Sequence, residues 1–132
     1  MGYAIKEVAA KLNLTAYTLR YYEKAGLLPF VKRDHSGNRV FDDNDLEWVM
    51  LIRCLRDTGM PVGEIKCYVD LCIEGDSTME TRRQMIVRHK LAVEQRIEQM
   101  QGCLARINKK LGCYEKVAAG AGGDVCNPAH KS

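Results

Sequence analysis

Apolar positions near the start of the chain recur with the period of an α-helix. Over residues 5–12 they follow the i, i+3, i+4, i+7 spacing of one buried stripe. These residues are Ile5, Val8, Ala9 and Leu12. After a two-residue connection, Thr15 is suited to accept hydrogen bonds from the free N–H groups at the start of a second helix. This second helix is predicted to run from Ala16 to about Ala25, where Gly26 supplies the left-handed residue that ends it.

The pattern changes after Pro29. Two short apolar runs, at residues 30–31 and 40–41, bracket a polar turn that contains Gly37. This arrangement predicts a β-hairpin. A hairpin that follows two helices joined by a tight turn is the wing of a winged helix-turn-helix unit, whose second helix enters the DNA major groove.

Two more amphipathic helices are predicted before residue 75. The first begins near the acidic residues 43–45, which suit a helix N-terminus, and continues to Gly59. Its apolar face, which is expected to pack on the head, contains Trp48, Leu51, Ile52 and Leu55. The second begins at Pro61 and ends near Gly75. The sequence therefore predicts a winged helix-turn-helix DNA-binding domain over residues 1–75.

The next segment, residues 76–118, is predicted to be one long helix. Ser77 and Glu80 have the spacing of a capping box at its start. Further on, apolar residues alternate by four and three, as in a coiled-coil heptad seam. The seam residues are Val93, Ile97, Met100, Leu104, Ile107, Leu111 and Tyr114. From Thr78 to Lys116 a continuous helix would span about 58 Å, too long to bury its stripe against so small a domain, so we expect a homodimer. Residues 119–132 are predicted to be a flexible tail.

The fold class is therefore all-α dominated, with a winged helix-turn-helix head, a small β-hairpin wing and a long C-terminal dimerisation helix. Leu19 and Tyr22 of the second helix are expected to face the core, whereas other residues of this helix and the cations of the hairpin face DNA. The predicted DNA-binding residues are Thr15, Tyr17, Thr18, Arg20, Tyr21, Lys32, Arg33 and Arg39. A simpler interpretation of the hairpin cations is that they are solvated turn charges.

Composition favours a small regulator over an enzyme. The net charge is only +3 in 132 residues, so a nucleic-acid surface must be local. No Ser/His/Asp set, paired carboxylates or phosphate loop indicates catalysis, and no cofactor is expected. No apolar run approaches the roughly 18 residues of a membrane span, and no signal peptide opens the chain, so we expect a cytoplasmic protein without membrane contact. The six cysteines are therefore expected mostly as thiols.

These motifs resemble the MerR family of transcriptional regulators over nearly the whole chain. The family resemblance is carried by RYYEKAGLL at residues 20–28, GNRVF at residues 37–41 and the long terminal helix. The residues similar to the NmlR and AdhR branch are Arg33-Asp34, Trp48, the stretch 52–56, Thr58-Gly59-Met60, Tyr68, the stretch 75–78, Arg82, Lys109-Lys110-Leu111 and Tyr114. The resemblance implies a dimeric activator that distorts an overlong promoter spacer for RNA polymerase. It also implies a response to reactive aldehydes or nitrosative stress.

Cys54 matches the recurrent thiol of that branch and is the predicted sensor. It lies off the apolar face of its helix, at the rim of the packed surface. Its neighbours at i−7 and i+3 are Glu47 and Asp57, so any charge that activates the thiol must come from another helix or from the partner subunit. The alternative is that Cys54 only fills space.

The remaining cysteines suggest a second hypothesis. Cys113 and Cys126 could ligate a soft metal ion such as Cu(I) or Zn(II), as in MerR relatives that sense metals. Cys67 and Cys72 are expected to be packing residues, and a structural role is expected for Cys103. A coiled-coil adaptor that does not bind DNA is a further alternative to the transcriptional regulator.

Overall fold

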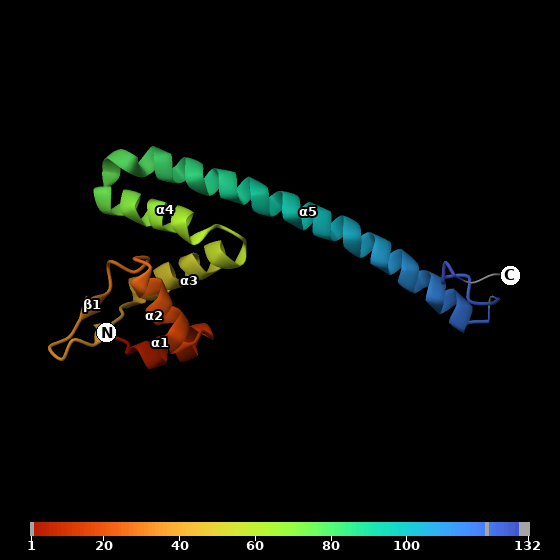
Figure 1. Ribbon diagram of the computed structural model, residues 1–132, viewed down its shortest axis with the longest axis horizontal. Helices are drawn as coiled ribbons and strands as arrows, with labels where there is room; N and C mark the ends of the chain where they lie inside the picture. Colours follow the sequence, from red (N-terminus) through yellow and green to blue (C-terminus); the bar gives the residue numbers. More distant parts are fainter. Residues whose placement is uncertain (1, 121, 130–132) are drawn as a thin grey trace. The chain divides into compact units, whose positions relative to one another are not determined.

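The computed structural model describes residues 2–120 and 122–129, and helices dominate this part of the chain (Figure 1). It divides into two compact units, Met1–His89 and Lys90–Ser132. The boundary lies inside the long helix, whereas the sequence pattern places it near residue 75. No helix among the described residues is long and apolar enough to cross a membrane.

The first two helices, α1 (Ile5–Leu12) and α2 (Ala16–Lys24), confirm the predicted helix-turn-helix pair. The Thr15 hydroxyl accepts a hydrogen bond from the backbone N–H of Thr18 at 3.0 Å and so caps α2. Gly26 follows α2 with φ of 79°, a conformation that a side chain would strain. Local sequence signals therefore set both ends of α2.

A short antiparallel hairpin, β1 (Lys32–Arg33) and β2 (Arg39–Val40), confirms the predicted wing (Figure 1). In its register Lys32 lies opposite Val40 and Arg33 lies opposite Arg39. A bridge between Tyr3 and Phe41 extends the pairing towards the start of the chain. Backbone hydrogen bonds between Tyr3 and Phe41 thus attach the base of the wing to the start of the chain.

One apolar core holds the N-terminal unit together. Leu19 and Tyr22 lie in it, as predicted, and Phe41 at the base of the wing is completely buried. Burying one such side chain stabilises the fold by about 1.5–3 kcal/mol relative to leaving it exposed. The other buried members are Val8, Ala9, Leu27, Leu28, Val49, Ile52, Leu55, Met60, Ile65 and Val69.

Helix α3 (Asp43–Asp57) starts with a reciprocal cap between two carboxylates. The Asp42 side chain accepts from the backbone N–H of Asp45 at 2.8 Å, and the Asp45 side chain accepts from the backbone N–H of Asp42 at 3.0 Å. Burial raises the pKa of the Asp45 carboxyl, an effect that the hydrogen bond from Asp42 opposes. The predicted start of this helix is confirmed.

Helix α4 (Val62–Glu74) is joined to the core by an aromatic cluster. The indole N–H of Trp48 donates to the Leu27 carbonyl at 2.8 Å. Its ring meets Phe30 edge-on at 5.5 Å between centroids and stacks on Tyr68 of α4 at 6.1 Å. The predicted packing of the Trp48 face on the head is confirmed.

A short 3-10 helix (η1, Asp76–Thr78) precedes the long helix α5 (Met79–Ala118). The predicted capping box between Ser77 and Glu80 is wrong. The Glu80 carboxylate instead accepts two hydrogen bonds from the Arg83 side chain, at 2.7 and 2.9 Å. Arg83, one helical turn after Glu80, binds the carboxylate in place of the backbone N–H of Ser77. The 3-10 helix occupies the position where the cap is predicted.

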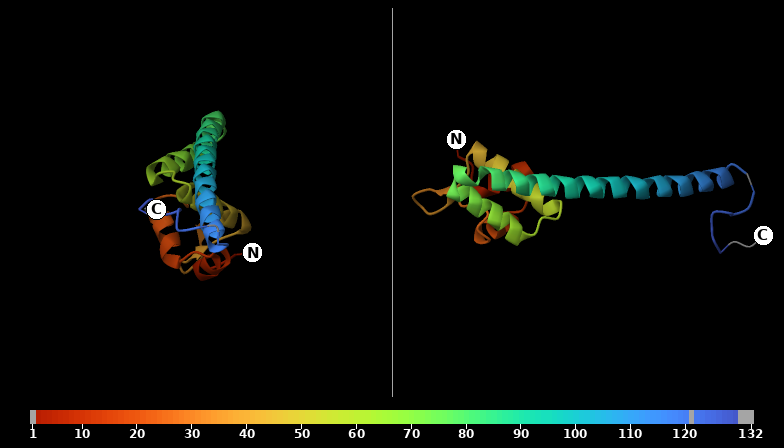
Figure 2. Two further views of the ribbon diagram at one scale, coloured as in Figure 1. Left: turned by 90° about the vertical axis from the view of Figure 1, so that its right-hand side faces the viewer. Right: turned by 90° about the horizontal axis from the view of Figure 1, so that it is seen from above.

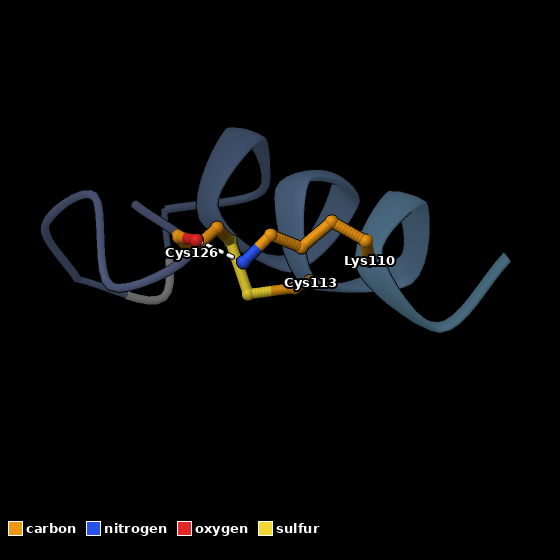
Figure 3. Close-up of a disulfide and its surroundings, with 3 residues drawn as sticks. All are labelled: Lys110, Cys113 and Cys126. Atoms are coloured by element: carbon orange, nitrogen blue, oxygen red, sulfur yellow. Dashed lines mark hydrogen bonds between the residues drawn. A yellow bond between two sulfur atoms is a disulfide. The ribbon is translucent and has the colours of Figure 1, made fainter. Parts of the chain in front are cut away.

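The C-terminal unit consists of the rest of α5, which is one uninterrupted helix, and a short segment that returns to it (Figure 2). A disulfide joins Cys113 of α5 to Cys126 (Figure 3). The sequence predicts a flexible tail here, but Cys126 is only 2% exposed. The described part of the tail is therefore tied to the helix.

Candidate nucleic-acid interface

Helix α2 presents a polar and aromatic face to solvent. Tyr17 is 78% exposed and Tyr21 is 45% exposed, and Arg20 is exposed between them. On the opposite side of the same helix, Leu19 and Tyr22 are buried. The packing of the helix thus determines which of its residues are available to a ligand.

The two threonines at the start of α2 are already engaged within the chain. The hydroxyls of Thr15 and Thr18 are hydrogen-bonded to each other at 2.9 Å, and Thr15 also caps the helix. Both predicted DNA-binding threonines therefore contribute to the helix start, where backbone N–H groups favour anionic ligands such as phosphate.

The wing is fastened to α2 through Glu23. Its carboxylate forms an ion pair with Arg33 at 2.7 Å and a second ion pair with Arg39. Arg33 also donates to the Gly37 carbonyl across the turn at 2.6 Å. Sequence reasoning missed Glu23 because it lies 10 and 16 residues before its partners, a separation that no helical or strand periodicity links.

The turn of the wing is stabilised by Asp34. Its carboxylate accepts from the backbone N–H groups of Ser36 at 2.9 Å and Asn38 at 3.0 Å. Gly37 has φ of 82° at the tip. The third predicted cation of the wing, Lys32, is exposed on β1.

A hollow of about 670 Å³ lies among α1, α2 and the wing. Arg20, Arg33 and Arg39 line it together, although they come from different elements. Lys6 at the start of α1 adds a fourth cation, which the sequence analysis did not single out. The lining carboxylates are Glu7 and Asp34, so cations outnumber anions at this surface. Such a local basic surface suits a phosphate backbone despite the low net charge.

Four cysteines are free and lie in different surroundings. Cys54 on α3 is exposed, which confirms its predicted place outside the core. Cys67 is exposed on α4, so the expectation that it packs in the interior is wrong. The buried face of α4 is formed by Ile65 and Val69, and Cys67 lies between them in sequence and faces away. Cys72 is half-buried and Cys103 is exposed.

Cys54 is linked to the start of α5 through Thr58. The Thr58 hydroxyl donates to the Cys54 carbonyl at 2.6 Å and lies 2.7 Å from Nε2 of His89. A hydroxyl has one proton to donate, so we assign the proton of the second bond to His89 Nε2. The turn that carries Cys54 is therefore hydrogen-bonded to α5.

The two cysteines considered as metal ligands, Cys113 and Cys126, are joined to each other in the disulfide. A sulfur atom in a disulfide lacks the thiolate charge that binds soft metal ions. In the part of the chain that the structure describes, no group of three or more His, Cys, Asp or Glu residues is arranged to hold a metal ion.

The sequence and the fold both match known transcriptional regulators. Residues 3–71 match the MerR HTH family regulatory proteins, and residues 46–109 match the MerR DNA-binding family. An HTH-type transcriptional regulator of Haemophilus influenzae is 40% identical over 90% of this chain and 88% of its own length. AdhR of Bacillus subtilis is 44% identical over 62% of this chain and 59% of its own length.

Two crystal structures are similar along most of the chain. HiNmlR, a MerR family regulator lacking the sensor domain that was solved bound to promoter DNA, has 40% identity and a TM-score of 0.84, with 90% of this chain and 94% of that chain covered. A MerR family regulator from Bacillus thuringiensis has 38% identity and a TM-score of 0.79, with 85% and 98% covered. The similarity to HiNmlR and AdhR is consistent with the NmlR and AdhR branch. Since a family model spans more than half of the sequence, the chain belongs to the MerR family of helix-turn-helix regulatory proteins.

Proposed function

We propose that this MerR-type regulator binds an inverted-repeat promoter as a homodimer and changes transcription in response to a thiol-reactive electrophile. The observation that carries the promoter-binding part is the similarity, at a TM-score of 0.84, to HiNmlR bound to promoter DNA. The exposed face of α2 and the basic hollow beside it support the same assignment.

In this proposal α2 enters the major groove and the wing contacts the backbone. Arg20, Tyr17 and Tyr21 are exposed on α2, which suits them to base edges or to the phosphates that border the groove. Lys32 and Arg33 on the wing provide sequence-independent phosphate contacts. RNA polymerase is the proposed partner at the promoter.

The homodimer is proposed to form along α5. Leu104 is 54% exposed, and its neighbours along the stripe are also largely exposed in the single chain. The stripe consists of Val93, Ile97, Met100, Leu104, Ile107, Leu111 and Tyr114. An apolar stripe in heptad spacing on an otherwise polar helix is suited to pair with a second copy. A twofold dimer would present two α2 helices to two half-sites.

Cys54 is the proposed sensor. Addition of its thiol to an aldehyde forms a carbon–sulfur bond and moves the thiol proton to the carbonyl oxygen. A nitrosothiol would instead transfer its nitroso group to the sulfur and leave as a thiol. Either product adds bulk and polarity one turn before Thr58, which is hydrogen-bonded to His89 of α5. Modification is thereby expected to shift α3 against α5 and so to change the DNA geometry presented to RNA polymerase.

The DNA surface can be tested with two exposed arginines. Arg20→Ala should lose binding to a selected operator duplex, because Arg20 lies on the proposed recognition helix. Arg88→Ala removes the same charge from an exposed position on α5 and should bind normally. Fluorescence anisotropy with specific and non-specific duplexes over a salt series measures both. Equal affinities of Arg20→Ala and wild type for the operator would contradict the proposed surface.

The sensor can be tested against a second exposed thiol. Cys54→Ser should lose the transcriptional response to formaldehyde or to a nitrosothiol but keep operator binding, whereas Cys67→Ser should keep both. The readout is promoter output in cells together with anisotropy on the purified variants. An electrophile response that survives in Cys54→Ser would refute the thiol switch. A response to copper or zinc that is lost only in Cys126→Ser would favour the soft-metal alternative.

A further inference from the structure

We propose that Cys113 and Cys126 form a reversible redox pair that exchanges with anionic low-molecular-weight disulfides and thiols, of the chemical class of glutathione. A transcriptional regulator works in the compartment that holds its DNA. Disulfides in reducing compartments of this kind are usually transient or redox-sensing rather than structural. The site is distinct from Cys54 and lies in the C-terminal unit.

The pair connects the end of α5 to the segment that follows the helix. The two Cα atoms are 5.9 Å apart and 13 residues separate the cysteines in sequence. Cys126 is buried, whereas its neighbour Val125 is 70% exposed. The Lys110 ammonium group donates to the Cys126 carbonyl, as the close-up shows (Figure 3). The disulfide and this hydrogen bond hold Cys126 against the helix.

The surroundings of the pair are strongly basic. A hollow of about 560 Å³ is lined by both cysteines and by Arg106, Lys109, Lys110 and Lys116, together with Gly112 and Val125. Among the described residues, no Asp or Glu lines it. The four cations are spaced by three, one and six residues, which places them on one side of α5. A thiolate is the attacking species in thiol–disulfide exchange, and its negative charge is complementary to these cations. They also concentrate anionic reactants.

The cysteine pair and most of this basic hollow lie on the side of α5 away from the predicted dimer seam. Cys113 follows Leu104 by nine residues, which at ~100° per residue places it on the opposite side of α5 from the seam. Arg106 and Lys109 lie on the same side as Cys113. A small anionic molecule can therefore reach the pair while the seam is occupied by a second copy.

The exchange is balanced as two thiol–disulfide steps. The thiolate of Cys113, which is less buried than Cys126, attacks one sulfur of an oxidised glutathione-type disulfide; a mixed disulfide forms and one small thiolate leaves. The Cys126 thiolate then attacks the Cys113 sulfur and releases the second small thiolate. Two electrons pass from the protein to the small disulfide, and the two thiol protons end on the released thiols. Reduction runs the same steps backwards and consumes two small thiols.

The first experiment follows the thiol content of the full chain in buffers of reduced and oxidised glutathione. Differential alkylation and peptide mass spectrometry report each cysteine separately. At millimolar total glutathione, Cys113 and Cys126 should change together between the dithiol and the disulfide as the ratio of reduced to oxidised glutathione is varied. A pair that stays oxidised in millimolar reduced glutathione, or stays reduced in millimolar oxidised glutathione, overturns the proposal.

The second experiment tests the role of the cations. The reduced chain should be oxidised faster by anionic oxidised glutathione than by cationic cystamine, by about tenfold at low salt. The double variant Lys109→Gln/Lys116→Gln should lose most of this preference, and the matched variant Lys6→Gln/Arg88→Gln, changed at two exposed cations of the other unit, should keep it. Equal rates with the two disulfides in the wild type would overturn the assignment to anionic reactants.

Discussion

At the scale of single residues, Glu23 connects α2 to the wing. Both of its ion-pair partners, Arg33 and Arg39, were predicted to contact phosphate. One carboxylate shared between two guanidinium groups leaves a net charge of +1 in this group of three. The wing cations thus have a structural task in addition to any contact with DNA, and their substitution affects more than one phosphate contact.

Arg39→Ala should weaken binding to all duplexes alike and lower the slope of log affinity against log salt by about one. It also leaves Glu23 with a single partner beside the DNA surface. The double variant Glu23→Gln/Arg39→Ala should therefore recover part of the loss, with a coupling of about 1 kcal/mol, or roughly fivefold in Kd. Fluorescence anisotropy on the four proteins of the cycle provides the coupling. Additive effects would show that Glu23 does not restrain the wing at the DNA.

The Glu80 carboxylate has a lowered pKa that can be measured directly. Hydrogen bonds from Arg83 and Gln84 lower its pKa to about 2, below the ordinary value of 4.5. Because the pKa is depressed, the stabilisation from these hydrogen bonds is fully present above about pH 4.5 and is lost as the pH falls towards 2. Their contribution to stability is therefore constant near neutral pH. A carbon-detected NMR titration should place Glu80 near 2. Arg83→Met should move it upward, and Arg88→Met should leave it unchanged.

At the scale of elements, α5 combines two roles along one helix. Its first turns belong to the N-terminal unit, where His89 is hydrogen-bonded to Thr58 and Met85 is buried. Val93, the first residue of the apolar stripe, is half-buried, and from Ile97 onward the stripe is open to solvent in the single chain. Within the monomer, α5 therefore buries apolar side chains only in its first turns.

Leu104→Asp should separate the subunits at micromolar concentration, because the dimer would bury a carboxylate in an apolar seam. Gln99→Asp introduces the same charge at an exposed position outside the seam, ~140° around the helix from Leu104, and should remain dimeric. Sedimentation equilibrium measures both association constants, and we expect a loss of more than tenfold for Leu104→Asp alone. A Leu104→Asp protein that sediments as a dimer would assign dimerisation to another surface.

At the scale of the whole molecule, the proposed function requires two heads to bind one duplex together. A twofold dimer matches half-sites that face the same side of the DNA, and one turn of B-DNA takes about 10 base pairs. Inserting about five base pairs between the half-sites should reduce the affinity to that of a single half-site. Anisotropy with the two duplexes measures the loss. Leu104→Asp should be insensitive to the insertion, whereas insensitivity of the wild type would mean that the heads bind independently.

Much of the fold follows from local sequence signals. Helix α1 coincides with its predicted apolar stripe, Thr15 caps α2, and Gly26 ends it, because each of these effects acts within about one helical turn. The family resemblance and the exposed face of α2 could likewise be read from the chain. The capping box at Ser77 failed because Arg83, on the same helix, competes for the Glu80 carboxylate.

The sequence alone therefore determined the order of the elements, their apolar faces and the family to which the chain belongs. Only the tertiary structure brought Glu23 to Arg33 and Arg39, placed Cys67 on the surface, and joined Cys113 to Cys126 within a basic hollow. The physical reason is distance along the chain. Periodicity and capping report interactions within a few residues, whereas an ion pair, a hollow or a disulfide depends on how segments 10 or more residues apart pack against each other.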